Sequence, residues 1–213
     1  MNGVDSTAFF CIMDGICFDK GRIICGIVGV ILGALFKHFL ELWRQDRKMK
    51  KEDENRKKWL RNDYFEKARQ YFFGYADNMT EASIIANMPN QNQNIENKLN
   101  DFVEFRRLVT PCPFYINDDE KKELFKYADL MDCYMYKLKQ VSYYKELLDK
   151  FQQWENANQY TISVNSPQYQ HESYKNQLNI DAFNKAANEA ENIKQIIFSI
   201  RANPNSTINK RVI

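Results

Sequence analysis

The chain has 213 residues, of which 44% are hydrophobic and 27% charged, and its formal net charge is +2 at pH 7. This length suffices for a modest domain with a hydrophobic core, and such a small net charge disfavours a protein that coats nucleic acid. The seven glycines and five prolines are few, and apolar residues recur at helical rather than alternating spacing. The sequence therefore predicts an all-α fold.

Residues 1–22 predict a short segment at a membrane interface. Within them, residues 8–18 (AFFCIMDGICF) are mostly apolar, but they are interrupted by Asp14 and are too few to cross a bilayer as a helix. We expect this segment on the outer face of a membrane, with a re-entrant hairpin as the alternative. Cys11 and Cys17 either form a disulfide on an oxidising face or serve as small apolar residues.

Residues 23–43 predict a single transmembrane helix. The stretch from Ile23 to Phe36 contains no charged residue, and 21 helical residues reach about 31 Å, close to the thickness of a hydrocarbon core. A cleaved signal peptide is disfavoured, because acidic residues outnumber basic ones before the run and no small-x-small site follows it. A buried helix of a soluble core is disfavoured by Lys37 and Trp43, which suit lipid headgroups.

Residues 44–58 (RQDRKMKKEDENRKK) predict a charged helical stalk and set the orientation of the span. Eight of these residues are basic, whereas only Lys20 and Arg22 are basic before the span, so the C-terminal part is expected in the cytoplasm. The stalk either binds anionic headgroups or acts as a solvated spacer. The residues expected at the membrane surface are Arg44, Arg47, Lys48, Lys50 and Lys51.

Small residues recur every four positions along one face of the predicted membrane helix. These residues are Gly21, Cys25, Gly29 and Gly33. Such spacing lets two helix backbones approach closely, so the sequence predicts a homo-oligomer assembled through this face.

Residues 59–201 predict a cytoplasmic helical bundle. The membrane helix is expected to continue to about Tyr75, because only Gly74 would break it before that point. A further helix is expected over Thr80–Asn87, and residues 90–94 (NQNQN) are expected to form a loop. The next helix is expected to end near Thr110, because the two prolines that follow lack backbone donors. Its apolar positions are Ile95, Leu99, Phe102, Phe105 and Val109.

The longest pattern predicts one helix over residues 118–156, opened by Asn117 as N-cap with Glu120 three residues later. Its apolar residues alternate spacings of three and four, as in coiled coils. They are Leu124, Tyr127, Met131, Tyr134, Leu138 and Val141, and the pattern then drifts to Leu148, Phe151 and Trp154. An antiparallel partner is predicted from Phe183, Ala186, Ala190, Ile193, Ile197 and Ile200.

Two polar segments are predicted to lack stable structure. Residues 157–178 form a linker that contains Pro167 and few apolar side chains, so we expect disorder, or else a binding role. Residues 202–213 are expected to fray as a flexible tail.

The sequence predicts no enzyme, no cofactor, no metal and no nucleic-acid partner. Only two histidines exist, His38 and His171, and Gly74 is the only glycine after Gly33, so histidine-based triads, paired-histidine metal sites and glycine-rich phosphate loops are disfavoured. Residues 59–213 carry nineteen basic and twenty acidic residues, too balanced for a phosphate backbone.

The functional hypothesis is a single-pass membrane anchor that self-associates and presents a cytoplasmic protein-binding domain, as a scaffold, sensor or effector. Its partners are expected to be membrane lipid, further copies of itself and a cytoplasmic protein. The alternative is a membrane-perturbing or pore-forming effector or toxin that assembles through its N-terminal segments. An enzyme that acts on lipid or nucleotide is a third, weaker hypothesis.

Overall fold

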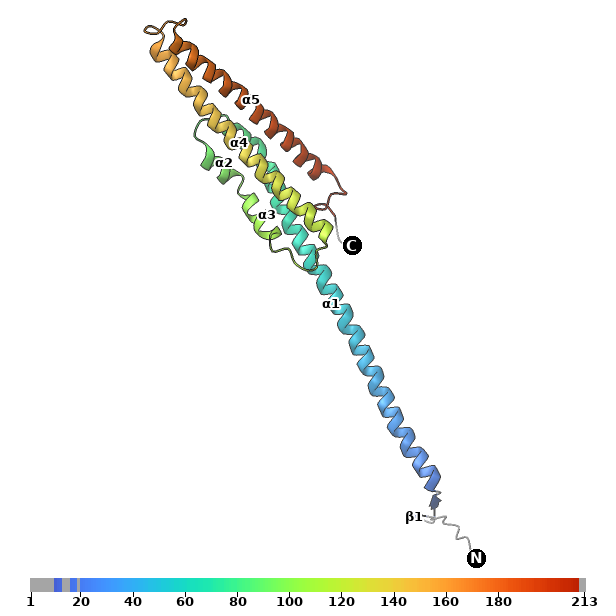
Figure 1. The fold of residues 1–213 in the computed structure, drawn as a ribbon. Helices are drawn as coiled ribbons and strands as arrows, with labels where there is room; N and C mark the ends of the chain where they lie inside the picture. Colours follow the sequence, from blue (N-terminus) through green and yellow to red (C-terminus); the bar gives the residue numbers. More distant parts are fainter. Residues whose placement is uncertain (1–9, 13–15, 19, 211–213) are drawn as a thin grey trace, which may run out of the picture. The chain divides into compact units, whose positions relative to one another are not determined.

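The computed structural model describes the backbone of residues 10–12, 16–18 and 20–210, and the side chains of residues 29–210. The chain divides into two compact units, Met1–Arg56 and Lys57–Ile213, here called the N-terminal unit and the C-terminal unit. Helices account for most of the described residues (Figure 1), which confirms the predicted all-α class.

A short pair of strands opens the N-terminal unit. Strand β1 (Phe10–Ile12) pairs antiparallel with β2 (Ile16–Phe18), and Cys11 lies opposite Cys17 in the register. The sequence predicts no strands here, because three-residue runs are too short to show an alternating pattern. The other residues of the predicted interfacial segment, 1–9, 13–15 and 19, lie outside the described part of the chain.

Helix α1 (Lys20–Ala86) belongs to both units and is longer than predicted. It continues through the stalk, as expected, but it does not break at Gly74, and the separate helix predicted over Thr80–Asn87 is its last part. Gly74 lies where a Cβ atom would meet the carboxylate of Asp101, so glycine here permits a close helix contact. The helix ends before Pro89.

The predicted transmembrane helix over residues 23–43 is helical along its whole length. Within the described part of the chain, however, no helix has both the length and the apolarity needed to cross a bilayer. The side chains of residues 23–28, the first six of the predicted span, are outside that part.

Two short helices replace the single helix predicted before Thr110. Helix α2 (Asn92–Lys98) begins inside the segment predicted as a loop, and α3 (Asp101–Val109) follows after a break at Leu99 and Asn100. Asn90 accommodates the turn before α2 with a φ of 58°. The five predicted apolar positions of this region are all buried, and α3 ends at the predicted place.

Helix α4 (Asp118–Asn158) confirms the longest predicted helix and its start. The side chain of Asn117 accepts a hydrogen bond from the Glu120 backbone at 2.8 Å, and Glu120 in turn accepts one from the Asn117 backbone, which completes a capping box. Glu120 also forms an ion pair with Arg61 of α1, so the first turn of α4 is tied to another helix.

Helix α5 (Pro167–Ala202) packs against α4 as the predicted antiparallel partner (Figure 1), but it begins well inside the segment predicted to be disordered. Ser166 accepts a hydrogen bond from the Tyr169 backbone, and Pro167 occupies the first turn, where its missing donor costs nothing. Only residues 159–166 connect the two helices. The polar composition that predicted disorder was outweighed by these capping residues.

The core of the C-terminal unit lies where the last part of α1 meets α2, α3, α4 and α5. Two tyrosines bridge α1 and α4 reciprocally: the Tyr75 hydroxyl donates to the Met131 carbonyl at 2.5 Å, and the Tyr134 hydroxyl donates to the Met79 carbonyl at 2.9 Å. The two rings meet edge to face with centroids 6.3 Å apart. Burial and hydrogen bonding together thus fix one register between the helices.

Residues 203–210, part of the segment expected to fray, pack against the preceding helices. Ile208 is fully buried, and its carbonyl accepts a hydrogen bond from Arg69 Nε of α1 at 3.0 Å. Thr207 donates to Glu123 of α4, and Asn209 donates to the Arg201 carbonyl at the end of α5. The segment therefore joins three helices, through contacts that its polar sequence does not reveal.

We expect Ile208→Ala to lower the free energy of unfolding by about 2 to 4 kcal/mol, because it removes a fully buried aliphatic side chain. Urea unfolding of the full-length chain in mild detergent measures this loss. The matched control is Ile196→Ala on α5, whose side chain is 45% exposed, with an expected loss below about 1 kcal/mol. Equal losses for the two variants would show that residues 203–210 do not pack as described.

Candidate functional site

The four small residues of the predicted oligomerisation face fall on α1 in the N-terminal unit. The side chain of Cys25 and the surroundings of Gly21 lie outside the described part of the chain. Gly29 and Gly33 are exposed, and a Cβ atom at either position would meet no other atom within 4 Å. Open space beside both glycines leaves room for the approach of another helix. Self-association through this face remains a prediction.

The basic residues predicted at a membrane surface all lie exposed on α1. Lys50 forms an ion pair with Asp46 at 2.8 Å, and the guanidinium of Arg47 lies 3.8 Å from the centre of the Trp43 ring. Trp43 and Arg47 thus form a cation–π pair next to the apolar stretch. Headgroup binding by the five residues, Arg44, Arg47, Lys48, Lys50 and Lys51, remains a prediction.

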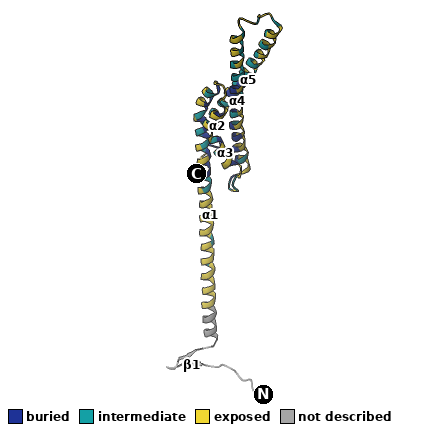
Figure 2. Ribbon diagram, turned by 90° about the vertical axis from the view of Figure 1, so that its left-hand side faces the viewer, coloured by how far each residue is buried: buried dark blue, intermediate teal, exposed yellow. Residues whose placement is uncertain are grey.

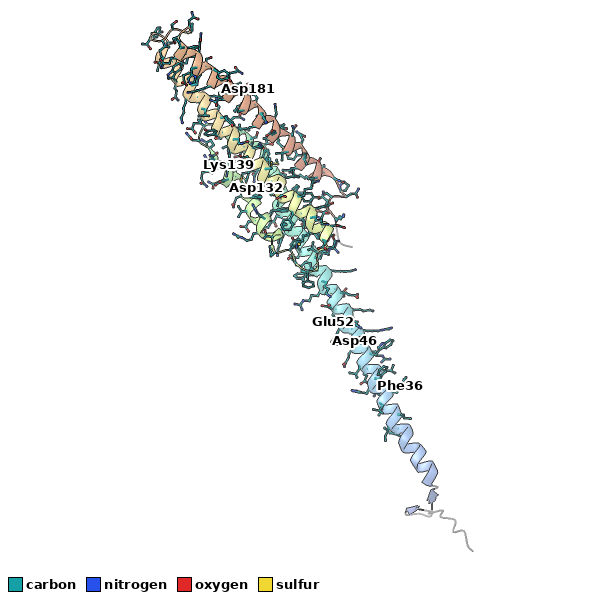
Figure 3. All side chains as sticks on the ribbon, in the orientation of Figure 1. Phe36, Asp46, Glu52, Asp132, Lys139 and Asp181 are labelled. Carbon is teal, nitrogen blue, oxygen red and sulfur yellow. The ribbon has the colours of Figure 1, made fainter. Side chains whose placement is uncertain are left out.

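Large apolar side chains project from α1 on the N-terminal side of these basic residues. They are between 47% and 73% exposed, and Phe36 is labelled among them in Figure 3. A water-soluble surface seldom carries so many neighbouring apolar side chains without a partner. The residues are Val30, Ile31, Leu32, Leu35, Phe36, Phe39, Leu42 and Trp43.

A second exposed region lies in the C-terminal unit, where α4 and α5 continue beyond the core. We call α4 residues 143–158, α5 residues 167–182 and their connection the hairpin tip. No residue of the hairpin tip is fully buried, and Figure 2 shows this end of both helices in the colours of intermediate and exposed residues. The tip is therefore a two-helix element with half-covered apolar side chains.

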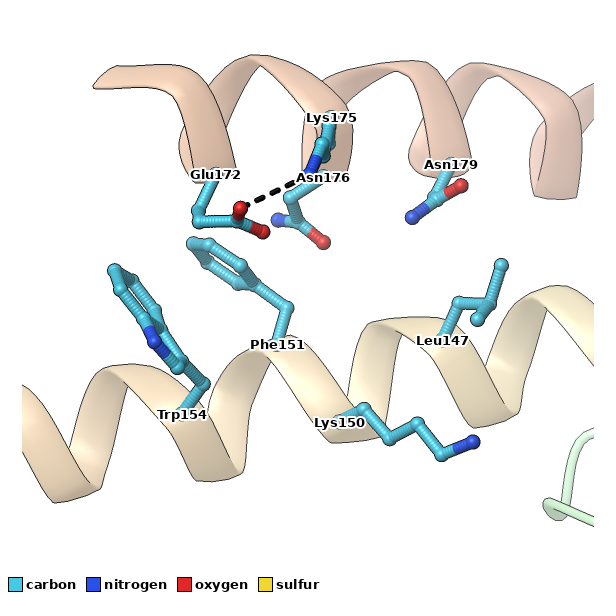
Figure 4. Close-up of a pocket in the computed structure, with 8 residues that line it drawn as sticks. All are labelled: Leu147, Lys150, Phe151, Trp154, Glu172, Lys175, Asn176 and Asn179. Atoms are coloured by element: carbon cyan, nitrogen blue, oxygen red, sulfur yellow. Dashed lines mark hydrogen bonds and ion pairs between the residues drawn. The ribbon is translucent and has the colours of Figure 1, made fainter. Parts of the chain in front are cut away.

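The hairpin tip holds a cavity of about 340 Å³ between its two helices (Figure 4). Helix α4 contributes the apolar side chains of Leu147, Phe151 and Trp154, which point toward α5. Helix α5 contributes polar side chains that point back toward α4. The polar residues are Glu172, Asn176 and Asn179, and Lys150 and Lys175 complete the lining.

The aromatic side of the cavity is held in place by ring contacts. Phe151 and Trp154 have centroids 5.7 Å apart, and Trp154 lies 6.1 Å from the ring of Tyr169 on α5. The Tyr169 hydroxyl donates to Glu155 at 2.6 Å, and this hydrogen bond, together with burial, raises the pKa of Tyr169. Tyr169 therefore remains a neutral donor at neutral pH.

The polar side of the cavity contains an unsatisfied acceptor. Asn176 Oδ1 is buried and has no hydrogen-bond partner, whereas Glu172 accepts from Lys175 at 3.0 Å. A buried carbonyl oxygen without a donor costs free energy, and because this one is closed to solvent, a bound group reaches it only if neighbouring side chains move. Lys150 extends away from α5 in Figure 4 and pairs with Glu146.

Other parts of the described chain are weaker candidates for a functional site. A smaller cavity of about 170 Å³ lies between α3 and α4, beside Arg106 and Phe125. Within residues whose side chains are described, no three or more histidine, cysteine or acidic side chains cluster in a way that could hold a metal ion.

The aromatic side chains of the cavity lie on a face of α4 that the sequence predicts, whereas the polar side chains on α5 do not follow from the sequence. The drift of the apolar pattern toward Phe151 and Trp154 already placed these residues on one face of α4. Glu172 and Asn176 fell inside the segment predicted to be disordered, so no face could be assigned to them. The N-cap Ser166 before Pro167 is the signal that could have placed them on a helix.

Comparisons of the chain with protein-family models, curated proteins and solved structures gave no match.

Proposed function

We propose that this chain is a single-pass membrane-anchored protein that presents a cytoplasmic, helical protein-binding domain and self-associates. Residues 23–43 anchor the chain, residues 44–58 lie at the inner membrane surface, and the C-terminal unit recruits a partner protein. The observation that carries the proposal is the row of exposed apolar side chains on α1 from Val30 to Trp43.

Lipid is the environment that best accounts for this row. Eight large apolar side chains face solvent on consecutive turns, and the sequence of residues 23–28 (IICGIV) extends the same apolar run. Burying such side chains stabilises each by about 1.5 to 3 kcal/mol, so the row favours an apolar surrounding. The Trp43–Arg47 pair at its end suits the boundary between hydrocarbon and headgroups.

The hairpin tip supports the assignment of the C-terminal unit to partner binding. Its apolar side chains are only half covered, its cavity has the size of ligand-binding clefts, and its two helices offer a groove to a further protein. In the rest of the bundle, by contrast, the apolar side chains on the facing sides of α1, α4 and α5 are buried in the core, so they are not open to a partner. Recruitment through the tip leaves the core undisturbed.

Membrane fractionation of cells that express the tagged full-length chain tests the anchor. We expect the wild type in the pellet after alkaline carbonate extraction, and the double variant Ile31→Asp/Leu35→Asp largely in the supernatant, because each charge near the centre of a span costs about 2.5 to 3.5 kcal/mol. The matched control is Ile84→Asp/Met88→Asp, at exposed positions of the C-terminal unit. Wild-type protein in the supernatant would contradict the proposal.

Affinity capture in mild detergent tests partner recruitment by the same protein. We expect a partner that is retained by the wild type and lost from a Phe151→Ala/Trp154→Ala variant whose helical content is unchanged. Retention of every captured protein by that variant would exclude the hairpin tip as the binding site.

A further inference from the structure

The cavity in the hairpin tip combines two features that together select a class of ligand. One wall is aromatic, made by Phe151 and Trp154, and the opposite wall carries the carboxylate of Glu172. Aromatic faces and acceptor oxygens both attract cations and repel anions. The site therefore favours a cationic group with hydrogen-bond donors.

The two lysines of the lining do not reverse this preference. Lys150 lies along α4, extends away from α5 and is paired with Glu146. Lys175 is 53% exposed and pairs with Glu172 from the solvent side, where an ion pair contributes less than about 1 kcal/mol. An incoming cation that stacks on Trp154 can displace Lys175, whose ammonium then returns to water.

Among organic cations, a guanidinium group fits this pair of walls best. Its planar face stacks on an indole ring, and its fork of donors can form two hydrogen bonds to a carboxylate at once. A quaternary ammonium has no donor for the Glu172 carboxylate. A cavity of about 340 Å³ has room for this group and the methylene chain that carries it.

We propose that the hairpin tip binds the guanidinium of an arginine side chain of a partner protein, with Trp154 stacking on it and Glu172 accepting its charged donors. This inference rests on the proposed function, because it assigns the partner's anchoring residue. The site itself is independent of the membrane anchor and of the partner's identity.

The test is a titration of the ¹⁵N-labelled full-length chain in detergent micelles with arginine blocked at both ends as its N-acetyl amide. Saturation is followed through the side-chain amide signal of Asn176. We expect binding with a Kd of about 1 mM, as suits a ligand of this size, and binding of tetramethylammonium at least about tenfold weaker. Equal binding of the two cations would overturn the assignment to guanidinium.

Variants of the two walls complete the test. Glu172→Gln and Trp154→Leu are each expected to weaken the binding of blocked arginine by about tenfold. Asp149→Asn removes an acidic residue of the same tip that pairs with Lys145 and does not line the cavity, and it is expected to leave binding unchanged. No saturable binding, or equal Kd values for wild type and Glu172→Gln, would overturn the proposal.

Circular dichroism shows whether Trp154→Leu remains folded, and the Glu172→Gln result stands without it because that side chain is partly exposed. The titration also separates the two proposals. If blocked arginine binds but no partner is captured, the proposed function fails and the site remains. If a partner is captured through the tip but blocked arginine does not bind, the inference fails and the function remains.

Discussion

Phe72→Ala is expected to lower the free energy of unfolding by about 3 to 5 kcal/mol. Phe72 lies on α1 with no exposed surface, and its ring contacts those of Phe105 on α3 and Tyr127 on α4, with centroids 6.1 and 5.6 Å away. Removing the ring leaves a cavity among three helices that cannot close without moving all of them. Urea unfolding of the full-length chain in mild detergent measures the loss.

Phe114→Ala is the matched control for this prediction. The same atoms are removed, but the Phe114 ring is 84% exposed, in the turn between α3 and α4. We expect a loss within about 0.5 kcal/mol. A similar effect of the two substitutions would mean that Phe72 is not at the centre of the core, and the described packing of α1 against α3 and α4 would be wrong.

The regular part of this core could be predicted from spacing alone. The six apolar positions predicted on α4 from Leu124 to Val141 are all buried, and on α5 the buried residues are Ala186, Ala190 and Ile197. Spacings of three and four place side chains on one face of a helix, and a face of that width needs a partner. Local sequence therefore sufficed for the two long helices and for the capping box at Asn117.

The errors in the prediction share one physical cause, which is that local polarity says little about distant contacts. The segment 203–210 is polar, yet the Ile208 side chain is buried in the core, and Arg69, 139 residues away, donates a hydrogen bond to its carbonyl. The first turns of α5 are polar too, but α4 supplies aromatic side chains that cover them. Gly74 suggested a break in α1, whereas the close approach of Asp101 explains why glycine stands there.

For the same reason, only the α4 side of the candidate site could be predicted from the sequence. Trp154 continued a recognisable apolar pattern, so its face on α4 could be read from the sequence. Asn176 stands out because its side-chain oxygen is buried without a hydrogen-bond partner, and this depends on which α4 side chains lie opposite it. Burial and a missing hydrogen-bond partner arise only when the two helices pack together, so neither helix sequence predicts them.

Stability is expected to fall steeply above pH 10, because three core tyrosines resist ionisation in the folded chain. Burial, with smaller contributions from Tyr134 and neighbouring acidic residues, holds the pKa of Tyr75 well above its ordinary value of 10. Burial and then Glu123 raise the pKa of Tyr127 to about 12, and burial and then Glu191 raise the pKa of Tyr134 further. The unfolded chain therefore loses these protons first as pH rises.

The direction of this change in the free energy of unfolding follows from proton binding. Below pH 10 all three phenols are protonated in both states, so their contribution to stability is complete. Above pH 10 the unfolded chain binds fewer protons than the folded one, and each tyrosine costs about 1.4 kcal/mol per pH unit until its folded pKa is reached. Between pH 9 and pH 11 we expect a loss of about 4 kcal/mol from the three together.

The double variant Tyr75→Phe/Tyr134→Phe separates this effect from the titration of surface groups. It removes two of the three phenols, so its loss between pH 9 and pH 11 is expected to be about 3 kcal/mol smaller than that of the wild type. At pH 7 the variant is expected to be less stable, because the hydrogen bonds to Met131 and Met79 are gone. The matched control is Tyr160→Phe, at a ring that is 92% exposed. Urea unfolding across this pH range gives all the values, and parallel pH profiles for wild type and double variant would place Tyr75 and Tyr134 outside the folded core.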